Sequence, residues 1–178
     1  APQVGPPGSA TRAVSAPGPS TALTFLGVDF QRGLRGNLHR RMMEFHQRVE
    51  TIWGPVATWD DTLDIHAAAG LPDGVVTVSC DVLGVGQVPP APGGTRPTIE
   101  LAAAGNVLVE GETFTGRSAR LTWAEAKDLL VFEGDGRSDA QLFRQLQAGA
   151  QPSSASAGKI LLWRSQNRVD VEDARYLD

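Results

Sequence analysis

The sequence predicts an all-β fold, an antiparallel sandwich or open roll, on three observations. Residues 118–123 share a pattern with residues 157–162, which begin 39 positions further along the chain. A weaker copy occupies residues 79–83, another 39 positions upstream. Short apolar runs alternate with Gly, Asn and Asp turns, without the helices that would separate parallel strands. A period built from short strands is typical of stacked β units, each of which buries its apolar face against the next.

The first 21 residues predict a disordered linker that precedes the folded domain. They are nearly all Pro, Gly, Ala, Ser and Thr, and Arg12 is their only charged residue. Such a segment buries too little apolar surface to offset the entropy of ordering. Residues 22–178 are then one domain. We interpret the chain as a piece of a longer protein.

The first half of the domain is predicted to consist of strands and polar loops. Residues 22–30 and the β-branched run at 75–85 have the composition of strands. Residues 33–37 predict a turn between strands. Residues 58–73 predict a polar loop, and the Pro/Gly-rich residues 89–97 predict a surface loop.

Residues 37–53 fit both a helix and a strand. Four apolar residues recur at helical spacing: Met42, Phe45, Val49 and Ile52. Four share the parity of a strand: Met43, Phe45, Val49 and Trp53. Because the neighbouring segments are rich in β signals, the strand is favoured.

The second half alternates regularly between strands and tight turns. Strands are predicted at residues 98–101, 106–110, 113–123, 129–133, 159–164 and 168–171. The Gly105-Asn106 pair predicts a bend, and Gly134-Asp135-Gly136 predicts a turn, because Gly and Asn tolerate positive φ.

A single short helix is predicted before the last pair of strands. Residues 139–148 begin at a capping Asp139 and are followed by Gly149. Leu142, Phe143 and Leu146 would then face inward. The Ser- and Ala-rich residues 151–157 predict a loop after the helix.

Composition and charge narrow the function classes. The formal net charge of -4 and the isoelectric point near 5.4 argue against a nucleic-acid partner, since proteins that bind nucleic acid are usually strongly basic. Cys80 is the only cysteine, so it has no partner for an internal disulfide. On an apolar strand it is expected to be a small buried side chain.

Catalytic and metal-binding motifs are not recognisable in the sequence. Asp60, Asp61, Asp64, His66 and Asp73 offer ligands for calcium, but their spacing matches no EF-hand loop. A carbohydrate-active enzyme could draw its carboxylate pair from Asp60, Asp61, Glu133 and Asp135. Because the sequence has no nucleophile elbow, phosphate loop or zinc-protease motif, we expect no enzyme, no metal and no cofactor.

Motif order over residues 99–174 is more specific than any single motif. The strand Gly105-Asn106-Val107-Leu108-Val109 is followed by the runs at 116–123, 126–134 and 158–163. This order resembles the OstA repeat of lipopolysaccharide-transport bridge proteins. The resemblance implies a twisted, open β-jelly roll whose two sheets form a V-shaped groove.

The resemblance also implies a function. In that family the apolar interior shelters the acyl chains of lipopolysaccharide between membranes, and homologous domains join edge to edge. We therefore expect a non-catalytic domain of the periplasm or cell envelope that binds or relays lipopolysaccharide or a similar amphipathic lipid. The alternative is a β-structured scaffold or assembly module that pairs through exposed edge strands.

The candidate groove residues are those assigned to the inward parity of the repeat strands. They are Val107, Val109, Leu121, Trp123, Leu129, Val131, Ile160, Leu162, Val169 and Val171. The same residue types would equally fill the core of a closed sandwich.

The candidate headgroup residues are arginines near the start of the domain. They are Arg32, Arg35, Arg40, Arg41 and Arg48. Only two acidic residues, Glu44 and Glu50, oppose them in this part of the sequence. Guanidinium groups bind phosphate oxygens in pairs, which suits an anionic lipid headgroup. The alternative is a solvated charged face.

Overall fold

The computed structural model describes residues 23–66, 70–90, 93, 96–145 and 151–177. Over these residues the chain forms one antiparallel sheet of ten strands, which confirms the all-β prediction. The strands are β1 (Leu23–Asp29), β2 (Arg32–Asn37), β3 (Met42–Val56), β4 (Val76–Val88), β5 (Thr98–Gly111), β6 (Phe114–Ala124), β7 (Leu129–Glu133), β8 (Ala140–Arg144), β9 (Ser153–Trp163) and β10 (Arg168–Leu177). A single 3-10 turn, η1 (Glu125–Lys127), precedes β7. The linker predicted at 1–21 lies outside the described residues.

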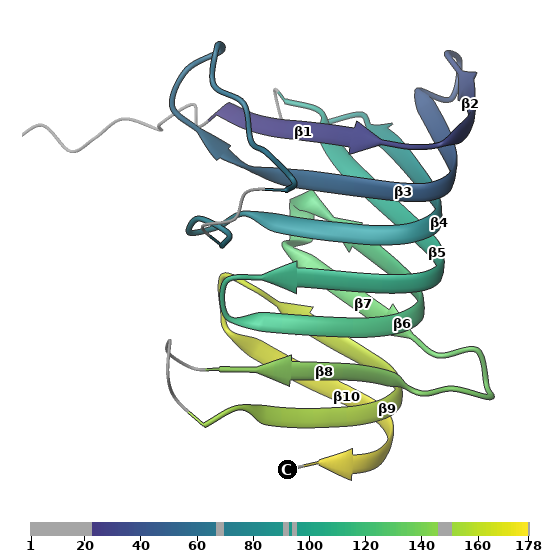
Figure 1. Ribbon diagram of the computed structural model, residues 1–178, viewed down its shortest axis with the longest axis vertical. Coiled ribbons are helices and arrows are strands. Elements are labelled where there is room, and N and C mark those ends of the chain that lie inside the picture. The colour runs from purple at the N-terminus through teal and green to yellow at the C-terminus, as the bar shows by residue number, and fades with distance from the viewer. Residues whose placement is uncertain (1–22, 67–69, 91–92, 94–95, 146–150, 178) are drawn as a thin grey trace, which may run out of the picture.

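The sheet is folded over into two layers, because its long strands bend near their middle (Figure 1). β1 pairs with residues 50–56 of β3, whereas β2 pairs with residues 42–46 of the same strand. In the same way β8 pairs with the first half of β6, and β7 pairs with the second half. We call the layer with β1 and β8 the front layer, and the layer with β2 and β7 the back layer. The layers are joined along one long side by the bends, and we call the opposite side the mouth.

Bulges and left-handed residues produce the bends. The pairing of β4 with β5 shifts register between Ser79 and Val82. Opposite this shift, Gly105 and Asn106 of β5 have φ of 77° and 47°. Asn106 donates a hydrogen bond from its side-chain nitrogen to Asp81, at 2.8 Å. A Cβ on Gly105 would lie 2.4 Å from the same carboxylate oxygen, so the bend requires glycine there.

The repeat seen in the sequence is a structural repeat of strands that cross from front to back. Across the back layer, buried side chains lie opposite one another in the row Leu83, Ala103, Leu121, Phe132 and Ile160. Leu83 therefore occupies the place of Leu121, whereas the sequence alignment gave that place to Val82. The earliest copy is displaced by 38 residues, from 83 to 121, and the later one by 39, from 121 to 160.

A closed hydrophobic core fills the space between the layers. Trp53 of the front layer and Trp123 of the back layer pack with ring centroids 4.9 Å apart. The residues of this core are at most 7% exposed, and Phe132, Leu130 and Ile160 at its centre are fully buried. Close packing of this kind is the main source of stability in a β-sandwich.

The ambiguous segment at 37–53 is a strand, as favoured, and belongs to β3. The helix predicted at 139–148 is wrong, because Ala140–Arg144 forms β8 between β6 and β9. Its side chains alternate, with Leu142 buried and Phe143 44% exposed. The apolar residues there suit either a helix or a strand. The strand forms because it can pair with the edges of both β6 and β9. Residues 146–150 of the predicted helix lie outside the described residues.

Three further expectations about elements are corrected. The turn predicted at 33–37 lies within the edge strand β2. The two strands predicted at 98–101 and 106–110 are one strand, β5, which continues through its bulge. The loop predicted at 151–157 is wrong from Ser153 onward, since β9 begins there. Small residues are needed in this part of β9, because Ala157 is fully buried under the core.

Candidate functional site

Most candidate groove residues lie in the closed core. Buried members are Val107, Val109, Leu121, Trp123, Ile160 and Leu162. Val169 and Val171 of the edge strand β10 are half-buried and pack against the end of the core. The interior between the layers is therefore filled by side chains, and an open groove through its centre is not present in the described residues.

The inward parity assigned to β7 is wrong. Leu130 and Phe132 are fully buried, whereas Leu129 and Val131 are only half-buried and lie on the other face. The register with β6 accounts for this, because Leu130 lies opposite Trp123 and Phe132 lies opposite Leu121, both of which face the core. A register that differs by one residue exchanges the buried and exposed faces of a strand.

Open space is found at the mouth, where the two layers end. Two adjoining hollows of about 300 and 360 Å³ share Gly74, Asp128, Arg164 and Ser165. We call them together the mouth cleft. Its apolar lining residues are Trp53, Val75, Val76, Phe114, Trp123 and Leu162. Its charged lining residues are Glu112, Glu125, Asp128, Arg144 and Arg164.

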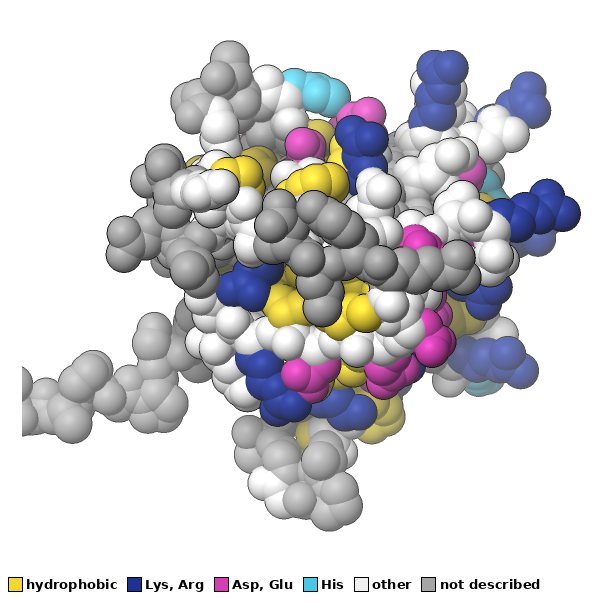
Figure 2. Space-filling view, turned by 90° about the horizontal axis from the view of Figure 1, so that it is seen from below, with side chains coloured by type: hydrophobic (Ala, Val, Ile, Leu, Met, Phe, Trp, Pro, Cys, Tyr) yellow, Lys and Arg dark blue, Asp and Glu magenta, His cyan; other side chains and the backbone are white. Residues whose placement is uncertain are grey.

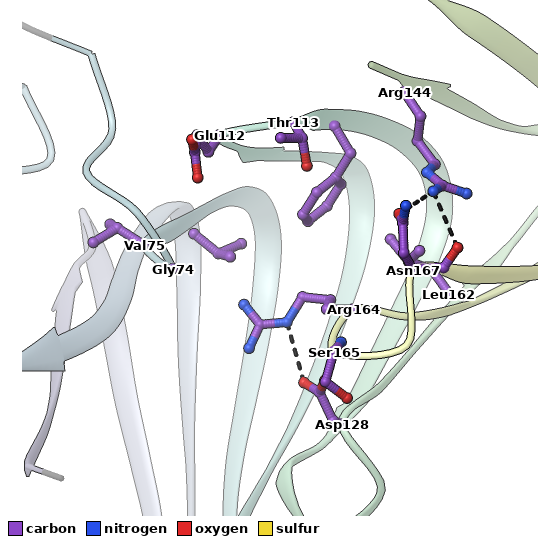
Figure 3. A pocket seen from close by; sticks show the side chains of 12 residues that line it. Gly74, Val75, Glu112, Thr113, Asp128, Arg144, Leu162, Arg164, Ser165 and Asn167 are labelled. Carbon is purple, nitrogen blue, oxygen red and sulfur yellow. Dashed lines mark hydrogen bonds and ion pairs between the residues drawn. The ribbon is translucent and has the colours of Figure 1, made fainter. Parts of the chain in front are cut away.

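Arg164 is the charged side chain that reaches into this cleft (Figure 3). It belongs to the turn between β9 and β10, and its Nε donates to Asp128 at 3.2 Å. Its guanidinium carbon lies 5.6 Å from the ring centroid of Trp53, a cation–π contact from the back layer to the front. Asp128 is held in turn by the backbone N–H of Ser165, at 2.7 Å.

A second arginine crosses the mouth. Arg144, at the end of β8 in the front layer, donates to the backbone oxygen of Asn167 at 3.1 Å and to its side-chain oxygen. Asn167 lies in the β9–β10 turn of the back layer, so this contact closes one end of the cleft (Figure 3). Both arginines are partly exposed and stand beside an apolar floor. Two of the three carboxylates in the cleft are paired, Asp128 with Arg164 and Glu125 with Arg96. A floor of this kind with guanidinium groups above it suits an amphipathic anion.

The indole of Trp123 adds an unpaired donor beside the cleft. Its Nε1 is buried and has no hydrogen-bond acceptor among the described residues. Buried donors in folded proteins are usually paired, because an unpaired one costs free energy.

The headgroup arginines predicted from the sequence lie elsewhere. Arg32 and Arg35 are on β2, Arg40 and Arg41 are in the β2–β3 turn, and Arg48 is at the bend of β3. All five are exposed, and none is among the described residues that line the mouth cleft. The structure thus separates the predicted basic cluster from the apolar cleft.

Acidic residues of the 58–73 loop have local structural partners. Asp61 accepts hydrogen bonds from the backbone N–H groups of Thr58 and Ala57, at 2.8 and 3.0 Å, and the bond from Thr58 is the main cause of its lowered pKa. Asp64 accepts one from the N–H of His66 at 2.9 Å. Within the described part of the chain, no three acidic, His or Cys side chains form a group that could hold a metal ion.

Sequence reasoning missed the cationic side chains of the mouth. Arg144 lay in a segment assigned to a helix, and Arg164 was taken as the end of a strand. The repeat held a signal for Arg164, because it stands 39 positions after Glu125, which lines the same cleft. Equivalent positions of two repeats thus place opposite charges along one edge of the sandwich.

A search against protein-family models finds no match to this chain, and a search of curated proteins finds no significant one. No helix in the described residues is long and apolar enough to cross a membrane.

Proposed function

We propose that this chain is a non-catalytic cell-envelope domain that binds or relays an amphipathic lipid, lipopolysaccharide or one like it. The proposal has two supports: the motif order that resembles the OstA repeat, and the mouth cleft. The cleft is the observation that carries it. Phe114, which is half-buried, offers apolar surface for an acyl chain beside the buried Trp53 and Leu162, and Arg144 and Arg164 offer donors for an anionic headgroup.

The closed core determines where such a lipid would bind. Inserting an acyl chain between Leu121 and Ile160 would displace close-packed side chains, which is costly. The mouth is held by fewer contacts, the Arg144–Asn167 hydrogen bonds and the contact between Arg164 and Trp53. We therefore assign the acyl chain to the mouth, on the outer side of the packed pair Trp53 and Trp123.

The experiment uses the tryptophans of the cleft as reporters. Trp59 is 88% exposed in a loop, and Trp163 stacks under Arg168 outside the cleft. In a Trp59→Phe/Trp163→Phe background only Trp53 and Trp123 fluoresce. We expect a lysophospholipid with a brominated acyl chain to quench this emission saturably, because bromine quenches indole at contact.

Charge variants separate specific capture from general adsorption. Replacing Arg164 by Gln should weaken lipid binding about tenfold, because one charge-assisted hydrogen bond to the headgroup is lost. Arg137→Gln is the matched control, since Arg137 is exposed in the turn between β7 and β8. No quenching of Trp53 and Trp123 at any lipid concentration would exclude the mouth as a lipid site.

The second candidate function is assembly through the ends of the sandwich. At the last strand, a hollow of about 300 Å³ is lined by Leu142, Ala155, Val169 and Val171 together with polar residues. Figure 2 views this end and shows hydrophobic side chains exposed at its centre, ringed by charged ones. At the other end Phe30 and Leu34 are 40% and 52% exposed. Homologous β domains joined edge to edge would cover both surfaces.

A further inference from the structure

The hairpin of β2 and β3 combines positive charge with exposed apolar side chains. Residues 30–41 contain four arginines and no Asp or Glu, whereas the whole chain has a formal net charge of -4. The rest of the molecule therefore sums to -8. Large apolar side chains of the same hairpin are exposed: Leu34 52%, Leu38 94%, Met42 41% and Met43 47%.

The apex of this hairpin is held in a defined shape. Asn37 accepts a hydrogen bond from the backbone N–H of Arg40 at 3.0 Å, and the N–H of Arg41 donates to the carbonyl of Leu38 at 3.2 Å. The carbonyl of Arg41 accepts from the N–H of Gln87 at 3.0 Å, which ties the turn to the end of β4. Leu38 is thus presented to solvent by an ordered turn that also carries Arg40 and Arg41.

We propose that this hairpin docks on an anionic lipid bilayer surface. Leu38 and Met42 would enter the boundary between headgroups and acyl chains, and Arg35, Arg40 and Arg41 would contact lipid phosphates. A protruding apolar residue among arginines suits a bilayer, which offers an apolar layer directly beneath a negative surface. Nucleic acid offers the negative charge without that layer, so it would leave Leu38 and Met42 without an apolar environment.

This inference is independent of lipid capture in the mouth, because none of residues 30–43, the part of the hairpin that would dock, lines the described cleft. It adds a contact that would orient the domain: the end of the sandwich that carries β2 faces the bilayer. The opposite end, formed by β9 and β10, then points away from it (Figure 1). Three of the five predicted headgroup arginines, Arg35, Arg40 and Arg41, would on this view meet a membrane surface, and a captured lipid would meet Arg144 and Arg164.

The test is flotation of the whole chain with two kinds of vesicle, phosphatidylcholine alone and phosphatidylcholine mixed with phosphatidylglycerol. We expect binding to the mixed vesicles only, weakened by salt. Removing two charges in Arg40→Gln/Arg41→Gln should weaken binding roughly 25-fold, about fivefold for each charge. Leu38→Ser should weaken it about tenfold through lost apolar burial.

Matched controls come from exposed residues elsewhere. Arg137→Gln removes a charge and Trp59→Ser removes an apolar side chain that is 88% exposed, and neither should change vesicle binding. Because all these positions are on the surface, thermal unfolding should be the same for every variant. Failure of the wild type to bind the mixed vesicles overturns the proposal. If the wild type instead binds duplex DNA through the same arginines, the proposal is overturned as well. Equal losses in the controls overturn it as well.

Discussion

Single glycines show how closely the two layers are packed. Gly116 of β6 lies in the front layer directly over Phe132 of β7, in the back layer. A Cβ at Gly116 would meet the Phe132 ring at 2.3 Å, and that ring is fully buried and has no room to move aside. A small residue at this point is what allows the large ring to fill the centre of the core.

We therefore predict that Gly116→Ala lowers the free energy of unfolding by about 1–3 kcal/mol, the usual cost of overpacking a core. Urea unfolding followed by tryptophan fluorescence measures it. Gly36→Ala is the control, because Gly36 has no atom within 4 Å of the added Cβ and no positive φ. The two variants differ only in the packing around the methyl group. A loss of the same size in both would contradict the packing argument.

The thiol of Cys80 is a second probe of how tightly the core is packed, after Gly116. Burial, together with the neighbouring Asp81 carboxylate, raises the pKa of Cys80 to about 11. A raised pKa means that the neutral thiol persists through neutral pH, and only the thiolate reacts with alkylating reagents. The sequence led to the expectation of a buried cysteine here, and Cys80 is indeed 5% exposed.

We predict that iodoacetamide leaves Cys80 unmodified in the folded protein at pH 8 and modifies it fully in denaturant. Mass spectrometry after timed labelling gives both rates. Labelling in the folded state should follow global unfolding, because the thiol lies inside the core. Rapid labelling under native conditions would contradict both the burial and the raised pKa.

Among the elements, strand β8 differs most from the prediction, because a helix was predicted at residues 139–148. A helix would have placed Leu142 and Phe143 together on one inward face. In the strand they point to opposite sides, so Leu142 is buried and Phe143 is 44% exposed. The facing of two adjacent residues therefore distinguishes the two structures.

We predict that Leu142→Ala lowers the free energy of unfolding by about 2–5 kcal/mol, through lost burial and a cavity. Phe143→Ala should change it by less than about 1 kcal/mol, since its ring is half in solvent. Chemical denaturation of both variants supplies the comparison. Equal losses would support a helix in place of the strand.

The local sequence pattern predicted a strand correctly where that strand coincides with a single apolar run between two turns. β7 was predicted at residues 129–133, the bounds it has in the structure. It did not predict which face β7 buries, because the register between β6 and β7, which places Phe132 opposite Leu121, is set by the folded turn. Nor could it join residues 98–101 to 106–110, since Gly105-Asn106 has the same composition in a bulge as in a turn.

The candidate site was less predictable than the fold, because it is formed by segments that are far apart in the sequence. Parity identified Trp123 and Leu162 as inward residues, and both line the mouth cleft. The cleft itself depends on which turns meet at the end of the two layers. Asp128 and Ser165, 37 positions apart, come together there because β7 pairs with β9, and Trp53 reaches Arg164 only after the sheet has folded over. No local pattern encodes such a meeting.

At the scale of the whole molecule, the ends of the sandwich are the surfaces that folding leaves unfinished. Val169 and Val171 of β10 are half-buried, because nothing in the described chain packs beyond them. Edge strands with apolar side chains tend to pair with other chains. If the ends serve assembly, a second copy of this domain is the simplest partner available in solution.

We predict that the wild-type chain associates as its concentration rises, and that Val169→Glu/Val171→Glu stays monomeric. Two carboxylates in a covered apolar end would be desolvated, whereas in the monomer they remain partly in water, so the fold should survive. Sedimentation velocity over a range of concentrations gives the association state, and thermal unfolding checks the fold. The control is Val131→Glu, at a half-buried valine on the outer face of β7, away from either end. A wild type that is monomeric throughout, or a control that loses association as completely, would show that the ends are not the pairing surface.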